Sequence, residues 1–506
     1  MTRAVVVGIL VLCWSGIGAQ AQAQETVELT LDRAIRLGME QSYRVRHLRI
    51  GIARTRALQQ AQRARLKSRV DLSLNAPDYG VISDYEYDSG LGRDVLVHEN
   101  SRRWQANLSV RQPVVLFGYP TNGYLSLNSR FYRYTQIQDD ESYTRYYNRY
   151  FVAYEQPLFQ PNTLRYELQE AEYDTEGAQM DFRRNVVRLM EDMAEAYYAL
   201  LDLVEQRQIN EAHVAQLERA AAAARARSAR DPAHAGELAE IRVELANARE
   251  RVEQARSEFR LEAAGMKQRL RLEPSDSLTI KPVALEVEPV HVDVERAVEF
   301  GMTLTPRMRQ LEIWKWDNTW NIERTRARRG FRLDLELTYG REMADTYLMH
   351  VLEEPRNSYT VSVNAHVPIW DWGERAARVH AAELRLEQTE LSIQEAESEI
   401  RSDIINAVET LEAYQDRALV MQENLTLAEG LAEESLARYE AGEIGILELL
   451  RSLDRNTETA MNFLDTYLGY RSALLDLQQM TYFDFEIGGP VFDRFEGTAV
   501  DGDMDG

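Results

Sequence analysis

Two long runs with helical periodicity constrain this sequence more than any other feature. They occupy residues 164–229 and 373–441, and no proline interrupts either run. At 1.5 Å per residue each would form a helix about 100 Å long, whereas helices of globular proteins average about 11 to 12 residues. Their high charge leaves only a narrow apolar seam, as in Leu425, Leu427, Leu431 and Leu436. This pattern predicts a coiled-coil wall.

The chain contains the same order of elements twice, which indicates an internal duplication. Each repeat, 24–275 and 276–485, reads as short helix, strands, long helix, short helix. The expected helices are 31–67, 164–229 and 237–272 in the first repeat and 292–329 (interrupted near 301–306), 373–441 and 446–480 in the second; the expected strands lie within 70–157 and at 331–340 and 358–367. Residues 486–506 are expected to form a disordered acidic tail.

Residues 1–23 have the pattern of a secretory signal peptide. Arg3 is followed by a short apolar run, 4–12, and then by alternating small residues, with cleavage expected after Ala21 or Ala23. Cys13 is the only cysteine and would be removed with the signal. The mature chain would therefore have no disulfide, thiol nucleophile or cysteine metal site.

Charge and hydropathy narrow the class further. The net charge of −23 argues against nucleic-acid binding, which needs a basic surface. No later segment has 18 uninterrupted apolar residues, so no spanning helix is expected. An exported chain of this kind is a periplasmic protein, a secreted protein or a β-barrel.

The predicted strands favour the barrel. In 331–340 and 358–367, apolar residues alternate with hydrophilic ones over about ten residues, the length and pattern of a strand in an outer-membrane barrel. An ordinary two-layer sheet would need a second layer, and the helices are already committed to a rod. The predicted lipid-facing residues are Leu333, Leu335, Leu337, Val361, Val363 and Val367.

Prolines mark the points where strands should pass into helices. Pro157 and Pro368 each follow apolar residues at alternate positions, and proline cannot continue a strand ladder. With Trp370 and Gly373 they form the predicted strand–helix junctions. No catalytic, cofactor-binding or metal site is expected, because the chain has neither H-E-x-x-H spacing nor a G-x-x-x-x-G-K loop.

At this point the sequence resembles the TolC family of outer-membrane efflux factors. The segments that carry the resemblance are 29–35 (LTLDRAI), 156–159 (QPLF), 367–373 (VPIWDWG) and 438–450 (RYEAGEIGILELL). The resemblance implies a mixed α and membrane-β fold, with a homotrimer sharing one antiparallel β-barrel and one periplasmic α-helical tunnel. It also implies an outer-membrane exit duct for efflux or type I secretion, docked to a periplasmic adaptor and an inner-membrane RND or ABC transporter. A soluble periplasmic coiled-coil scaffold is the alternative.

The sequence departs from the family in two places. The first repeat has room for four strands where two are usual, so either the barrel is wider or the hairpin around 117–123 lies outside or inside it. At the predicted periplasmic entrance, Glu448 matches an acidic position, but the residue one turn later is Arg451. The two could form part of a gate or an ordinary exposed pair. The adaptor-contact turns are expected at Asp231, Pro232, Gly236, Gly442 and Gly445.

Overall fold

The structure, a computed structural model, describes residues 26–88, 92–138, 141–230, 235–281, 285–328 and 330–494. The expected signal peptide therefore lies outside the described residues. The chain divides into two compact units. The helical unit contains Met1–Ser42, Leu189–Pro289 and Ala413–Ser472, and the sheet-bearing unit contains Tyr43–Arg188, Val290–Glu412 and Ala473–Gly506.

The helices follow the expected double order, except for the short helix α7 between two strands, which was not expected. The helices of the first repeat are α1 (Leu31–Gln41), α2 (Tyr43–Ala64), α3 (Thr163–Arg230) and α4 (Ala235–Leu270), and those of the second are α5 (Val294–Thr303), α6 (Pro306–Arg328), α7 (Leu348–Glu353), α8 (Glu374–Ala441) and α9 (Ile446–Thr481). The helix expected over 31–67 is two helices, because Ser42 is extended between them. Thr30 caps α1, its hydroxyl accepting a hydrogen bond from the Arg33 N–H at 3.3 Å.

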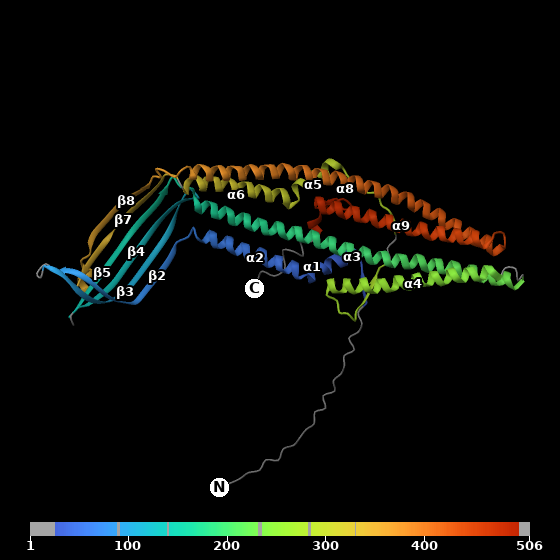
Figure 1. Cartoon of the computed structure of the whole chain (residues 1–506), viewed down its shortest axis with the longest axis horizontal. Helices are drawn as coiled ribbons and strands as arrows, with labels where there is room; N and C mark the ends of the chain where they lie inside the picture. The colour runs from blue at the N-terminus through green and yellow to red at the C-terminus, as the bar shows by residue number, and fades with distance from the viewer. Residues whose placement is uncertain are drawn as a thin grey trace, which may run out of the picture. The chain divides into compact units, whose positions relative to one another are not determined.

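Six strands of the sheet-bearing unit form one antiparallel sheet (Figure 1), in the order β2-β3-β4-β5-β7-β8. The strands are β2 (Arg69–Asp88), β3 (Arg93–Leu116), β4 (Tyr119–Gln138), β5 (Glu141–Leu158), β7 (Arg332–Asp345) and β8 (Arg356–His366). Strands β2 to β5 have 18 to 24 residues, more than the ten or so expected for the two strands of the second repeat, of which β7 has 14 and β8 has 11. Their apolar alternation covers only part of each strand, and backbone pairing continues through the polar part.

Two smaller pairings were not predicted. In the helical unit, β1 (Thr26–Leu29) pairs in parallel with β6 (Ser277–Ile280). In the sheet-bearing unit, β9 (Phe483–Asp484) pairs with β10 (Gly489–Pro490), and a 3₁₀ turn, Val491–Arg494, follows.

The tail expected from residue 486 is therefore wrong for residues 486–494. The buried Asp484 carboxylate accepts hydrogen bonds from the N–H groups of Glu486 and Ile487, at 3.0 and 3.2 Å. The Phe483 ring stacks on Phe300 with centroids 4.1 Å apart. These contacts order a segment that its acidity suggested would be disordered; residues 495–506 lie outside the described residues.

Candidate functional site: the sheet wall and the helix tips

Strand pairing sorts the side chains of the sheet onto two faces. Residues directly opposite each other in a ladder point to the same face. One row crosses all six strands and is apolar or aromatic throughout: Val70, Val110, Leu127, Val152, Tyr339 and Tyr359. Neighbouring positions on each strand belong to the other face, and these are mainly polar, as in the pairs Asp71–Ser109 and Thr338–Thr360.

The apolar side chains of this sheet are exposed, whereas a water-soluble sheet would bury them, and the polar face is buried at Ser126 and Thr338 in the middle strands. On the apolar face Val361 is 69% exposed and Val363 is 58% exposed, whereas Thr338 on the polar face is only 8% exposed. Apolar surface is normally removed from water, and a contiguous exposed apolar patch marks a contact with lipid or protein. The apolar face of this sheet is therefore a candidate contact surface for lipid or for another protein surface.

Five of the six predicted lipid-facing residues lie on the apolar face of β7 and β8. Leu335 pairs with Val363 and Leu337 with Val361, and Leu333 lies two residues earlier on β7. Val367 follows the last residue of β8 and is exposed.

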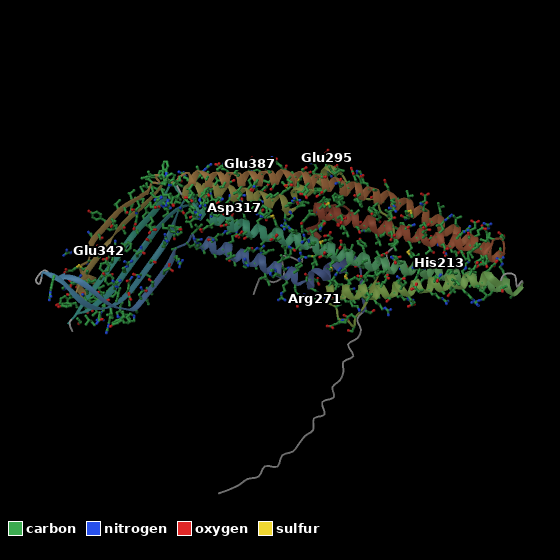
Figure 2. The ribbon with its side chains drawn as sticks, viewed as in Figure 1. His213, Arg271, Glu295, Asp317, Glu342 and Glu387 are labelled. Atoms are coloured by element: carbon green, nitrogen blue, oxygen red, sulfur yellow. The ribbon has the colours of Figure 1, made fainter. Side chains whose placement is uncertain are left out.

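The polar face carries interlocking aromatic and charged side chains. The Tyr147 hydroxyl donates to the Glu342 carboxylate at 2.9 Å, and its ring stacks on Tyr132 with centroids 4.7 Å apart. The Arg111 guanidinium lies 3.9 Å from the centre of the Tyr124 ring. Figure 2 labels Glu342 on this sheet.

The strand–helix junctions of the two repeats share an unusual backbone feature. Phe159 after β5 and Trp372 after β8 both have positive φ, 62° and 54°, a conformation that bulky residues seldom adopt. Pro157 lies in the last but one rung of β5, opposite Asp334, whereas Pro368 lies beyond β8.

Exposed aromatic and aliphatic side chains gather in these junctions and in the β3–β4 turn. They are Phe117, Phe159, Ile369, Trp370 and Trp372. Gly373 adopts φ +83° immediately before α8. Aromatic side chains of this kind are enriched where a barrel meets the membrane surface.

Helix α8 ends in a Schellman motif, which fixes the turn into α9. Gly442 has φ +84°, its N–H donates to the Tyr439 carbonyl at 3.0 Å, and the Glu443 N–H donates to the Arg438 carbonyl at 2.9 Å. Gly445 directly precedes α9. Gly236, expected in the other turn, instead lies in the first turn of α4, and Asp231 and Pro232 lie outside the described residues.

Apolar residues from both helix pairs form a buried core near these turns. Its members include Leu217, Ala224, Ile241, Leu245, Leu436, Ile444, Ile446, Leu449 and Leu453. The tips of α3–α4 and α8–α9 are therefore packed together in the helical unit.

A polar cluster that was not predicted joins the same two tips. The Tyr439 hydroxyl donates to the Glu237 carboxylate at 2.9 Å, and the Arg227 guanidinium lies 4.8 Å from the centre of the Tyr439 ring and 3.8 Å from Glu237. Burial, and then the bond to Glu237, raise the pKa of Tyr439. We call Arg227, Glu237 and Tyr439 the tip cluster. Residues 202 positions apart in sequence meet here, and no local pattern could have identified them.

The two predicted gate residues lie beside this core. Glu448 and Arg451 are both exposed on α9, and no ion pair joins them in the part of the chain that the structure describes. Leu449 and Leu453 occupy the opposite face of the same turns and are fully buried.

His213 on α3 is a buried polar residue in the helical unit (Figure 2). Its Nδ1 lies 3.0 Å from the Thr457 hydroxyl, and its Nε2 lies 3.9 Å from the Asp454 carboxylate. Burial lowers the pKa of His213, and the opposing attraction of Asp454 is smaller.

Across the described residues, no helix is both long enough and apolar enough to cross a bilayer.

Comparisons with known proteins agree with this architecture. Residues 319–481 match the model of the family described as outer membrane efflux protein. The fold is similar to that of the Campylobacter jejuni CmeC outer membrane channel, with 13% identity, a TM-score of 0.60, and coverage of 99% of this chain and 98% of that one. It is also similar to the Neisseria gonorrhoeae MtrE outer membrane channel in its open state, with 16% identity, a TM-score of 0.55, and coverage of 89% and 88%.

A third similar structure is a membrane protein from Pseudomonas aeruginosa, with 15% identity, a TM-score of 0.61 and coverage of 97% of each chain. No curated protein sequence matches the chain significantly. The predicted fold class is confirmed. The chain has the TolC-like fold, and its second repeat carries the outer membrane efflux protein family match.

Proposed function

We propose that this protein is the outer-membrane exit duct of an efflux or type I secretion system in a Gram-negative bacterium. One observation carries the proposal: one face of all six strands is apolar and exposed, and the other face is mainly polar, with Ser126 and Thr338 buried in the middle strands. That arrangement suits a wall with lipid outside and water inside. The family match and the similar channels support the same function.

The duct is a homotrimer. The sheet of one copy ends at β2 and β8, which have no further neighbour within the described chain. Unpaired backbone groups in lipid cost several kcal/mol each, so other copies must close the sheet. Three copies follow from the family resemblance.

The duct is passive and depends on partners for energy. Those partners are a periplasmic adaptor and an inner-membrane RND or ABC transporter. The adaptor contacts the helix tips, at the turn marked by Gly442 and Gly445 and at the segment that links α3 to α4, around Asp231, Pro232 and Gly236. Substrate selection belongs to the transporter.

The periplasmic entrance is formed by the start of α9. Three Glu448 carboxylates near one axis would repel each other and favour cations, and Arg451 one turn later moderates that charge. Glu448→Gln should lower the cation preference of the open channel, measured as a shift in reversal potential under a salt gradient. An unchanged reversal potential would show that Glu448 does not line the entrance.

The decisive experiment is fractionation followed by conductance. Expressed in a Gram-negative host, the protein should appear in the outer membrane as a trimer that resists SDS until it is heated, and it should conduct in planar bilayers. A water-soluble periplasmic monomer would instead support the alternative, a coiled-coil scaffold. The exposed apolar face of the sheet weighs against that alternative, because a scaffold in water would bury it.

A further inference from the structure

The β3–β4 hairpin is an integral part of the sheet. β3 pairs with β2 from Arg69–Arg111 to Asp88–Arg93, and β4 pairs with β5 from Tyr124–Glu155 to Gln138–Glu141. Because both edges of the hairpin are occupied, it cannot fold into the lumen or onto the outer surface without breaking these two ladders.

The faces of the hairpin match those of the other strands. Leu108 and Val110 on β3 share the apolar face with Leu125 and Leu127 on β4, and Leu108, Leu125 and Leu127 are exposed. Their neighbours Ser109, Asn128 and Ser126 belong to the polar face. A plug surrounded by water would have no reason to keep this apolar face.

We infer that each copy contributes all six strands to the barrel, with β8 of one copy pairing with β2 of the next. The inference rests on the proposed trimeric duct. Three copies of six strands make a barrel of eighteen strands, half as many again as three copies with four strands each. The partner at each sheet edge is a second copy of this chain.

Strand number sets the width of the exit. With strands 4.7–4.9 Å apart and tilted by 35–45°, eighteen strands enclose a backbone diameter of about 36 Å and twelve enclose about 24 Å. Lining side chains take about 5 Å on each side, which leaves lumens of about 26 and 14 Å.

An α-helix with its side chains is 10–12 Å wide. The wider lumen therefore admits large hydrated solutes and polypeptides that keep helical structure, and the narrower one barely admits a single helix. We infer that the barrel of this protein places no tight size limit on polypeptide-sized substrates.

Size-graded thiol labelling tests the width. The only cysteine of the sequence is Cys13, in the expected signal peptide, so Thr360→Cys introduces a single thiol on the polar face of β8, opposite Thr338. Intact cells are treated from outside with maleimide polymers of about 10 Å and about 20 Å diameter, which bracket the two lumens. Both should label the full-length trimer.

The matched control deletes residues 93–138, which removes β3 and β4 but keeps β2 antiparallel to β5. In this variant the larger polymer should label at least tenfold more slowly, while the smaller one still reacts. Exclusion of the larger polymer from the full-length trimer, or a cut-off that the deletion does not change, would overturn the inference.

A second measurement covers the case in which the deletion variant does not assemble. Electron cryomicroscopy of the full-length trimer should resolve eighteen strands, and a ring of twelve would refute the inference. Neither result on width affects the proposed duct, which fails only if no trimer appears in the outer membrane.

Discussion

The sheet wall and the helix tips use the same kinds of side chains in opposite ways. In the wall, valine and leucine residues such as Val361 are exposed and Thr338 is enclosed. At the tips, Leu449 and Leu453 are fully buried, and Glu448 and Arg451 face outward. The sequence of one chain therefore specifies two surroundings, and the direction in which apolar residues point distinguishes them better than composition does.

The largest expected effect is that of a charge placed on the apolar face of the sheet, which should prevent assembly in the membrane. Val361→Arg would cost about 2–4 kcal/mol per copy if Val361 lies near the bilayer midplane. We expect loss of heat-modifiable trimer from outer-membrane fractions, while the helical unit still folds. Ser362→Arg, on the polar face opposite Glu336, is the matched control and should assemble normally. Equal assembly of both variants would mean that the two faces do not meet different solvents.

Truncating the tip core should have a comparable energetic effect but a local one. Leu449→Ala removes a fully buried side chain, which typically costs about 2–5 kcal/mol. Amide hydrogen exchange over residues 446–453 should accelerate at least tenfold, with no loss of trimer. Leu447→Ala, at an exposed position on the same turn, should change exchange very little, and similar acceleration in both variants would contradict the burial pattern.

Removing one hydroxyl from the tip cluster should loosen the packed tips. Tyr439→Phe leaves Glu237 without its 2.9 Å hydrogen bond, and bonds to charged groups contribute about 1.5–3 kcal/mol. We expect a severalfold rise in single-channel conductance or open time. Arg219→Gln breaks an exposed ion pair with Glu433, worth about 0–1 kcal/mol, and should leave conductance unchanged. No difference between the two variants would exclude a role for the tip cluster in closure.

The smallest expected effect is a change with pH in the stability of the helical unit. Because burial lowers the pKa of folded His213 below its ordinary 6.5, the unfolded chain binds the proton more readily. The stability of the helical unit should therefore be full above about pH 6.5 and fall as pH decreases below it, by at most about 1.4 kcal/mol per pH unit for this group. In His213→Gln, the melting temperature should fall less as the pH decreases below about 6.5. His380→Gln, at an exposed position, is the control. If the melting temperature of His213→Gln fell with pH as it does in the unmodified protein, protonation of His213 would not be a cause of the instability.

Elements with a strong period could be predicted from the sequence. The long helix expected over 164–229 is Thr163–Arg230, and the faces of β7 and β8 follow from alternation alone. The number of strands in the first repeat could also be predicted from the sequence, but the place of the β3–β4 hairpin in the sheet could not. Pairing partners such as Leu116–Tyr119 and Arg69–Arg111 depend on which edges meet.

Long-range polar contacts escaped prediction for a similar reason. Tyr439 and Glu237 lie in different repeats, and each alone looks like an ordinary helix residue. The break at Ser42 and the ordered segment 486–494 depend on single hydrogen bonds and ring contacts. Such contacts leave no periodic trace in the sequence.

The two repeats differ in strand number but not in helix length. The first contributes four strands to the sheet and the second contributes two, yet α3 and α8 both have 68 residues and α4 and α9 both have 36. In the proposed trimer the sheet would have only threefold symmetry, whereas the helix pairs would approximate sixfold symmetry. A partner that binds the tips would meet six nearly equivalent sites whatever the number of strands. The width of the exit can therefore evolve without altering the surface that the pump assembly binds.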